Sequence, residues 1–301
     1  MPRITLLVLV LCFAQVSAFA QPKITPSHVF VQAKYIENEL KLILRHFKQP
    51  TTLTSKKLVA AFKPRHAWQQ TYVVLTKLNV FRKKQDLPGF AVNGMEPVLD
   101  LDPLLVYEQT QRILTELRIL KTRLAIRTTA SVPPFVSGKK PIDVFNQLSH
   151  VSLLLEELNN ETISPTYVFA EAMRAYEDST MILMASHIED TSYPPGKVSN
   201  VTPAQSLSST FELMDEIQRL QKSAKIPITD FSPFRHLTEI TPADVYNMVG
   251  MCLAELQTLK AYDHINSPTP AAEYHEAKIP ADVNQLIQWT VRKLKLIKEI
   301  R

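Results

Sequence analysis

The chain contains 301 residues, with only 5 glycines against 21 prolines and a formal net charge of +5. So few glycines argue against a glycine-rich phosphate-binding loop and against tight two-residue hairpins, which both depend on that residue. No sustained alternation of apolar and polar residues occurs, so the predicted fold class is all-α.

The first 20 residues have the pattern of a secretory signal peptide. Arg3 precedes an apolar stretch at residues 4–13, and the small residues Ala18 and Ala20 frame a cleavage site before Gln21. The apolar stretch is too short to span a bilayer. It also continues past Cys12, which argues against a lipid anchor there. We therefore predict that residues 1–20 are removed and that the mature chain, with no transmembrane segment, is exported to the periplasm or secreted.

Eight prolines recur at nearly constant spacing through the rest of the chain, apart from one shorter step between the fourth and the fifth. The last four repeat the first four at one constant separation, that of Pro26 and Pro165, which we call the repeat offset. A period of about 40 residues is typical of repeat proteins. It predicts two duplicated four-helix halves, residues 21–164 and residues 165–301. The prolines are Pro26, Pro64, Pro103, Pro141, Pro165, Pro203, Pro242 and Pro280.

Each of these prolines is followed by the pattern of an amphipathic helix. Mostly apolar residues stand 3, 7, 10, 14 and 17 positions after it, and such steps place them on one helix face. Leu117, which stands fourteen positions after Pro103, belongs to this set and is predicted to be buried. Proline suits the first helical position because its missing N–H would lack a partner there. The pattern therefore predicts eight helices, each with proline at its N-terminus.

The connections between these helices are long enough to reverse direction. A helix of about 20 residues is about 30 Å long, and about 16 extended residues can reach about 50 Å. Each connection can therefore return and start the next helix at the same end, which favours four parallel helices in each half. The alternative is an up-down bundle with long loops. The shorter step from Pro141 to Pro165 leaves no room to return, so the fourth and fifth helices should form an antiparallel hairpin, with Asn160 near the turn.

Motifs for cofactors, metals and catalysis are absent. The sequence has no Cys-x-x-Cys-His, His-Glu-x-x-His or Glu-x-x-His pattern, no phosphate-binding glycine motif and no Gly-x-Ser-x-Gly. His28 and His66 stand at a first-turn position that aspartate occupies in other units, so we expect them at the surface. We predict no cofactor, no metal site and no enzymatic activity.

Trp68, Tyr107 and Tyr246 are the candidate ligand-binding residues. Each stands four positions after a repeat proline, where other units have phenylalanine, so each brings a polar atom that packing does not require. The simpler interpretation is that rings at this position hold each helix against its neighbour. The sharper interpretation is an aromatic-lined pocket for a small molecule or peptide.

The predicted function is that of an exported, non-enzymatic helical-repeat scaffold that binds another envelope or extracellular protein, because repeat proteins present extended binding surfaces. The alternative is a small-molecule-binding or sensor-like bundle with its pocket among the repeated aromatic residues or between the halves. Basic residues at 34–65, 82–84 and 292–301 allow weak contact with anionic glycans or membrane surfaces. We expect no nucleic-acid partner for an exported protein.

Overall fold

The computed structural model describes residues 23–55, 57–98, 101–160 and 163–300, so the predicted signal peptide lies outside the described residues. Apart from an isolated bridge between Glu96 and Thr269, the described residues contain no β-structure, and the all-α fold class is confirmed. Every α-helix begins at one of the eight repeat prolines, as predicted. The elements are α1 (Pro26–His46), α2 (Pro64–Lys84), α3 (Pro103–Arg123), α4 (Pro141–Asn159), α5 (Pro165–Ala185), α6 (Pro203–Ser223), the 3₁₀-helix η1 (Ser232–His236), α7 (Pro242–Tyr262) and α8 (Pro280–Lys295).

In the described part of the chain, six of the eight α-helices, all except α3 and α5, share a second local signal in the first turn besides proline. The side chain two positions after the proline accepts a hydrogen bond from the backbone N–H of the N-cap residue, as in a capping box. Asp244 accepts from Thr241 in this way at 2.8 Å. In α2 the acceptor is a histidine, because His66 Nδ1 lies 2.8 Å from the backbone nitrogen of Lys63. This shared role explains why histidine, aspartate and glutamine alternate at one position of the repeat.

Among the described residues, every α-helix except α8 is followed by a left-handed residue that is not glycine. In α3 this residue is Ala125, with a φ of 56°, and the N–H of Ile126 returns to the carbonyl of Lys121 at 2.9 Å. That bond is the one expected in a Schellman motif. Asn160 adopts the same conformation after α4, at the turn where it was expected. The other left-handed residues directly after helices are Lys48, Asp86, His187, Lys225 and His264.

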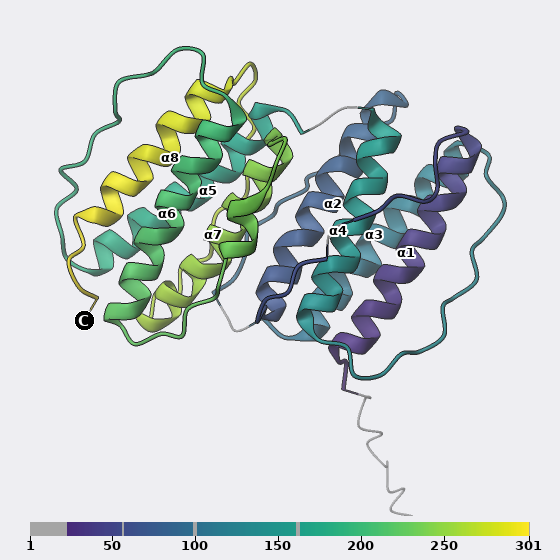
Figure 1. Ribbon diagram of the computed structural model, residues 1–301, viewed down its shortest axis with the longest axis horizontal. Helices are drawn as coiled ribbons and strands as arrows, with labels where there is room; N and C mark the ends of the chain where they lie inside the picture. Colours follow the sequence, from purple (N-terminus) through teal and green to yellow (C-terminus); the bar gives the residue numbers. More distant parts are fainter. Residues whose placement is uncertain (1–22, 56, 99–100, 161–162, 301) are drawn as a thin grey trace, which may run out of the picture.

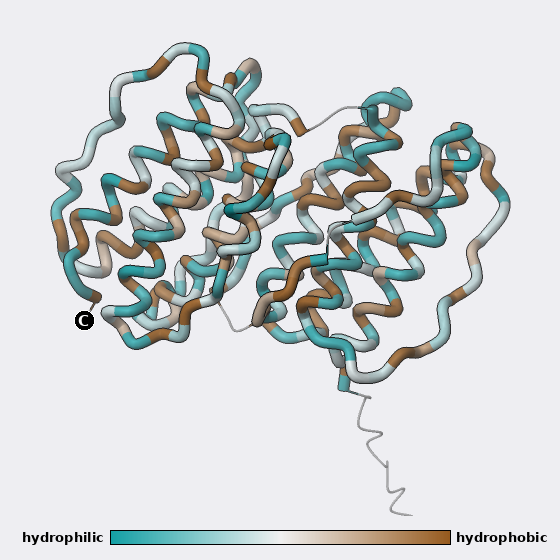
Figure 2. The backbone as a smooth tube through the Cα atoms, viewed as in Figure 1, coloured by the Kyte–Doolittle hydropathy of each residue, from teal (hydrophilic) through white to brown (hydrophobic). Residues whose placement is uncertain are grey.

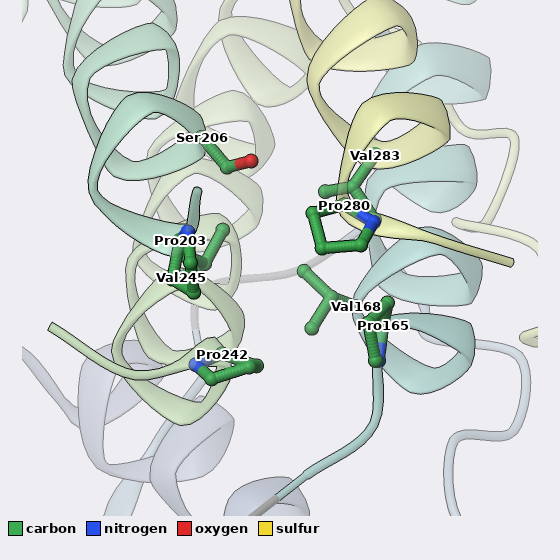
Figure 3. Close-up of a pocket in the computed structure, with 8 residues that line it drawn as sticks. All are labelled: Pro165, Val168, Pro203, Ser206, Pro242, Val245, Pro280 and Val283. Atoms are coloured by element: carbon green, nitrogen blue, oxygen red, sulfur yellow. The ribbon is translucent and has the colours of Figure 1, made fainter. Parts of the chain in front are cut away.

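The four helices of each half run parallel, as favoured from the connection lengths. All four prolines of the second half surround one shallow apolar depression, together with the residues three positions further on (Figure 3). The first half has the same arrangement around its own four prolines. Helices α1 and α2 each pack against α3 and α4, and likewise α5 and α6 each pack against α7 and α8. The two halves therefore share one pattern of neighbours, which is what a duplication predicts.

The connections run back along the bundles and are fastened there by hydrogen bonds. The connection after α1 is held by Asn146 of α4, whose amide pairs with the backbone of Leu58 at 3.0 and 2.9 Å. Its counterpart after α5 is held by Gln285 of α8, which donates to the carbonyl of Pro195 at 2.7 Å. Figure 1 shows these long segments on the outside of the helices. Parallel helices joined in sequence require such return segments.

The two bundles lie side by side in opposite directions and meet mainly along α2 and α7 (Figure 1). Thr76 of α2 pairs with Tyr246 of α7 at 3.1 Å, whereas His66, earlier in α2, pairs with Glu255, later in α7, at 2.7 Å. The two helices are therefore antiparallel. Helices α4 and α5 consequently also run in opposite directions, as expected from the short step between them. They do not pack together as the predicted hairpin, however, because the halves meet along α2 and α7.

Candidate functional site

Two of the three predicted ligand-binding residues lie at the proline-bearing end of the first bundle. Trp68 of α2 is 8% exposed, and its ring meets the edge of Tyr72 at 5.9 Å between centroids. Its indole nitrogen has no hydrogen-bond partner among the described residues. The hydroxyl of Tyr107 on α3 accepts from Gln32 of α1 at 2.9 Å. The ring of Tyr107 thus joins two helices, as the simpler interpretation expects.

Tyr246, the third predicted residue, lies at the proline-bearing end of the second bundle. That end faces the opposite way, so the structure does not bring the three residues together. The Tyr246 side chain is buried, and its hydroxyl bonds to Thr76 at 3.1 Å and accepts from Asn93 at 3.0 Å. Burial raises the pKa of this hydroxyl far above its ordinary value, and the carboxylate of Glu171 adds to the shift. Its polar atom therefore holds the bundles together, and a ligand role for the three residues stays a prediction.

Tyr246 belongs to a buried polar cluster between the bundles, which we call the junction network. Arg174 of α5 is its centre, 3.0 Å from Glu96 of the α2–α3 connection and 3.0 Å from Glu171 of α5. The Glu96 carboxylate also accepts from the Gln69 amide at 3.0 Å. Both halves supply members, because the α2–α3 connection inserts between the bundles and pairs there with Thr269. The members are Gln69, Asn93, Glu96, Glu171, Arg174, Tyr246 and Thr269.

The electrostatics of the junction network suit a structural role. Burial raises the pKa of Glu96 and of Glu171, while the nearby Arg174 guanidinium opposes both shifts. Burial alone would lower the pKa of Arg174, but the two carboxylates raise it overall. The guanidinium also donates to the carbonyl of Pro270 at 3.0 Å and lies 5.4 Å from the centre of the Tyr72 ring. Removing either partner of such a pair would leave a buried charge uncompensated and would destabilise the protein.

A second buried polar contact joins the bundles, between His66 and Glu255. The His66 side chain is fully buried, so the expectation that it lies at the surface is wrong. Its Nε2 lies 2.7 Å from Glu255, while its Nδ1 accepts from Lys63, which assigns the proton of the neutral ring to Nε2. Burial lowers the pKa of His66, against the pull of Glu255. Burial would raise the pKa of Glu255, but His66 and Arg65 together hold it at about 2.

Cys252, which could act as a nucleophile, is also buried, and burial raises the pKa of its thiol well above the ordinary value. In the part of the chain that the structure describes, no group of three or more histidine, cysteine, aspartate or glutamate side chains could hold a metal ion. No helix among the described residues is long and apolar enough to cross a membrane.

Cavities differ sharply in size between the helix ends and the surface. The depression among the second-half prolines has a volume of only about 10 Å³, enough for about one water molecule. A larger cavity of about 220 Å³ lies beside the junction network, bordered by Arg174, Met173, Met181 and His275. The predicted aromatic pocket at the proline-bearing ends therefore has little room in the second bundle, whereas space exists beside Arg174.

An exposed apolar segment stands out on the connection between α3 and α4. Val132, Phe135 and Val136 are 67%, 58% and 42% exposed, with Pro133 and Pro134 among them. Each proline fixes its own φ and keeps the residue before it out of the helical region, so the segment is extended. Figure 2 shows brown, apolar stretches along this outer connection. We call residues 132–136 the apolar segment.

The apolar segment is held in place at both ends. Before it, the backbone N–H of Ala130 donates to Glu39 at 3.2 Å, and after it, that of Lys139 donates to Ser27 at 3.0 Å. In the middle, the Phe135 ring lies 4.9 Å from the His28 ring. An extended segment fixed at both ends loses little freedom when something binds to it. Its apolar side chains nevertheless face solvent.

The apolar segment was not among the predicted sites, although its residues were visible as a proline-bearing connection. The signal that could have identified it is that two valines and a phenylalanine lie outside the repeating apolar pattern of the helices. In comparisons with known proteins, no family model, no curated protein and no solved structure matches this chain. Function must therefore be argued from the molecule itself.

Proposed function

We propose that this protein is an exported, non-enzymatic helical-repeat protein that binds another envelope or extracellular protein through the apolar segment, residues 132–136. The observation that carries the proposal is that three large apolar side chains are exposed on a segment fastened at both ends. Exposed apolar patches commonly mark interaction sites. Extended segments present alternate side chains and free backbone groups to a partner's groove. The partner is therefore a protein with an apolar groove that receives an extended chain.

The other half of the chain supports this choice by contrast. At the repeat offset, Val132, Phe135 and Val136 correspond to Ala271, Tyr274 and His275. Tyr274 packs against the Tyr167 ring at 5.2 Å between centroids. The matching connection thus has smaller or more polar side chains at the same places. Fold maintenance does not require the apolar residues of the first half.

We propose no catalytic activity because the reactive side chains are buried or paired within the protein. His66 is enclosed between Lys63 and Glu255, and Cys252 is buried with a raised pKa. Glu96 and Glu171, the carboxylates with raised pKa values, are both bonded to Arg174. A general base or nucleophile must reach a substrate. These groups are instead buried and paired with other side chains or with the backbone.

The binding proposal is tested by site-specific photo-crosslinking in the producing cell. A photoreactive phenylalanine at position 135 should give one discrete adduct with a protein, identified by mass spectrometry. The same group at position 274 is the matched control and should give no such adduct. Replacing Val132 and Val136 with serine should abolish the adduct at 135. Equal crosslinking from both positions, or an adduct indifferent to those serines, would count against the segment as the binding site.

The export proposal has its own test. Intact-mass measurement of the protein recovered outside the cytoplasm should show that the chain begins at Gln21 and has no added acyl mass. A full-length chain retained in the cytoplasm would overturn export, and a lipid-modified Cys12 would overturn the anchor-free form. Neither result depends on the crosslinking experiment.

Small-molecule binding is the second candidate, and the cavity beside Arg174 favours it. This cavity of about 220 Å³ approaches the size of ligand pockets and combines two methionines with charged groups. Native mass spectrometry of the purified protein separates the two candidates. A bound small molecule that is lost when Met181 is changed to tryptophan supports the cavity, whereas a bare chain that crosslinks only at position 135 supports protein binding.

A further inference from the structure

The C-terminal end of the first bundle is strongly basic. Because α1 to α4 run parallel, their last residues gather at one end of the bundle. Exposed cations occur there at the ends of α1, α2 and α3, whereas Asp86 and Glu157 are the nearby carboxylates that take part in no ion pair among the described residues. We call this set the basic end. Its cations are Arg45, Lys48, Lys83, Arg123 and Arg127.

These cations have few partners in the described part of the protein. Among the described residues, Lys83 alone of the five has a side-chain hydrogen bond, to the hydroxyl of Tyr167 at 3.3 Å, and its ammonium lies 5.8 Å from the centre of that ring. Within the described ranges, none of the five forms an ion pair. Exposed charges of one sign held close together repel one another unless an external anion compensates them.

A structural explanation for the charges is available, and the second bundle argues against it. Cations near helix C-termini stabilise the helix dipole, so four parallel ends could require them. At the repeat offset, however, Arg45, Lys48, Arg123 and Arg127 correspond to Met184, His187, Tyr262 and Asn266. Four parallel helices end there without these charges.

The matching end of the second bundle is also balanced in charge. Its cations are accompanied by nearly as many carboxylates, so it has no comparable excess. The cations there are Lys222, Lys225, Lys295 and Lys298, and the carboxylates are Glu189, Asp263 and Glu299.

We propose that the basic end binds the anionic headgroups of a phospholipid membrane. The cations stand at the ends of three parallel helices, which suits binding to an extended array of negative charge. Phe47 and Ile126 lie half-buried at the same end and add apolar surface between the charges. Each basic residue near an anionic bilayer strengthens binding by about fivefold in affinity. This attachment is separate from the apolar segment and does not depend on the proposed protein partner.

The test measures binding of the full-length mature chain to lipid vesicles. Sedimentation with vesicles of phosphatidylglycerol and phosphatidylcholine should show binding that weakens as salt is added, and pure phosphatidylcholine vesicles should show none. The variant Arg45→Met, Lys48→His, Arg123→Tyr, Arg127→Asn takes the residues of the second bundle. It should bind several hundred-fold more weakly, on the order of fivefold for each cation.

Two controls make the outcome decisive. The melting temperature of the fourfold variant should match that of the wild type, because its new residues already end parallel helices in this protein. Changing Lys222 and Lys298 to alanine, in the matching end of the second bundle, should leave vesicle binding unchanged.

The proposal fails if the fourfold variant binds vesicles as the wild type does, or if the wild type binds heparin but no anionic vesicle. If the fourfold variant unfolds, Arg45→Met and Arg127→Asn separately should each weaken binding about fivefold.

Discussion

The ammonium of Lys260 lies 2.6 Å from the carboxylate of Asp178, and both side chains are completely buried. Lys121 and Glu39, which precede these two residues by the repeat offset, form the same contact between α3 and α1 in the first half. Burying two charges costs solvation energy that only a well-made pair offsets. The recurrence of the pair at one place in both halves indicates that the parallel bundle depends on it.

Both pairs also fasten a returning connection. Asp178 accepts from the hydroxyl of Thr269 at 2.7 Å, and Glu39 accepts from the backbone N–H of Ala130 at 3.2 Å. Thr269 and Ala130 are themselves separated by the repeat offset. One carboxylate in each half thus joins two parallel helices to the segment that makes the parallel arrangement possible.

Lys260→Met should therefore be among the most destabilising single changes in the second half. It leaves Asp178 buried without its cation, and breaking a buried pair in this way costs about 3–5 kcal/mol. The free energy of unfolding in urea measures the effect. Asp215→Asn is the control, because its pair with Arg235 is exposed and such pairs contribute at most about 1 kcal/mol. Equal losses of unfolding free energy in the two variants would show that the buried pair stabilises the protein no more than the exposed pair does.

Leu117→Ala tests the helical repeat pattern directly. Leu117 is 1% exposed in the core of the first bundle, so its truncation should lower the free energy of unfolding by about 2–5 kcal/mol. Ile119→Ala, two positions further along α3, removes a side chain that is 42% exposed. It should cost much less, about 0.5 kcal/mol. If thermal or urea unfolding ranks the two variants in the opposite order, the assigned face of α3 is wrong.

Much of the fold could be predicted because its signals are local. The prolines set where helices begin, and the apolar steps set which face is buried, as Leu117 shows. Connection length favoured parallel over up-down order, because a chain must physically reach the far end of a helix to start the next one there. None of these inferences needs knowledge of distant contacts.

What could not be predicted depends on contacts between distant residues. His66 shares its repeat position with His28 of α1, yet His66 is fully buried and His28 is not, because α2 packs against the second bundle whereas α1 packs against α3 and α4. Gln69 and Glu96 likewise look like surface residues until the α2–α3 connection inserts between the halves. The predicted site residues Trp68, Tyr107 and Tyr246 share a repeat position, but antiparallel bundles place that position at opposite ends of the molecule.

The left-handed helix ends were also missed, except at Asn160, because the usual signal is glycine. Ala125 has a φ of 56°, a region that costs a non-glycine residue about 1–2 kcal/mol. Ala125→Gly should therefore raise the free energy of unfolding by about 1 kcal/mol despite the greater flexibility of glycine. Thr122→Gly, in the last turn of the same helix, should instead lower it by about 0.3–0.5 kcal/mol. Stabilities that fall in both variants would contradict the left-handed assignment.

The final prediction concerns pH and His66. In the folded protein burial lowers the pKa of this ring from 6.5, so the unfolded chain takes up its proton first as the pH falls. The contribution of neutral His66 to stability is therefore complete above about pH 6.5 and is lost progressively below it, by at most about 1.4 kcal/mol per pH unit. Glu255, whose folded pKa is about 2, contributes above pH 4.5 and loses its contribution as the pH falls further.

The measurement is the free energy of unfolding at pH 7.5 and at pH 5, about one and a half units below the ordinary pKa of histidine, for the wild type and His66→Gln. Glutamine is a suitable replacement because Gln205 accepts the N-cap N–H of Thr202 at the same repeat position, at 2.8 Å. The variant should be less stable at pH 7.5, since it loses the bond to Glu255, and should lose less stability on acidification. Both chains contain the buried carboxylates, so their contribution cancels in the comparison. This matters because their raised pKa values change stability with pH in the opposite direction to that of His66. His150→Gln provides a second comparison, because burial lowers the pKa of His150 as well, but this side chain is 17% exposed beside Glu37 and should carry a smaller part of the slope. If His66→Gln loses as much stability between pH 7.5 and pH 5 as the wild type does, protonation of His66 does not contribute to the pH dependence of stability.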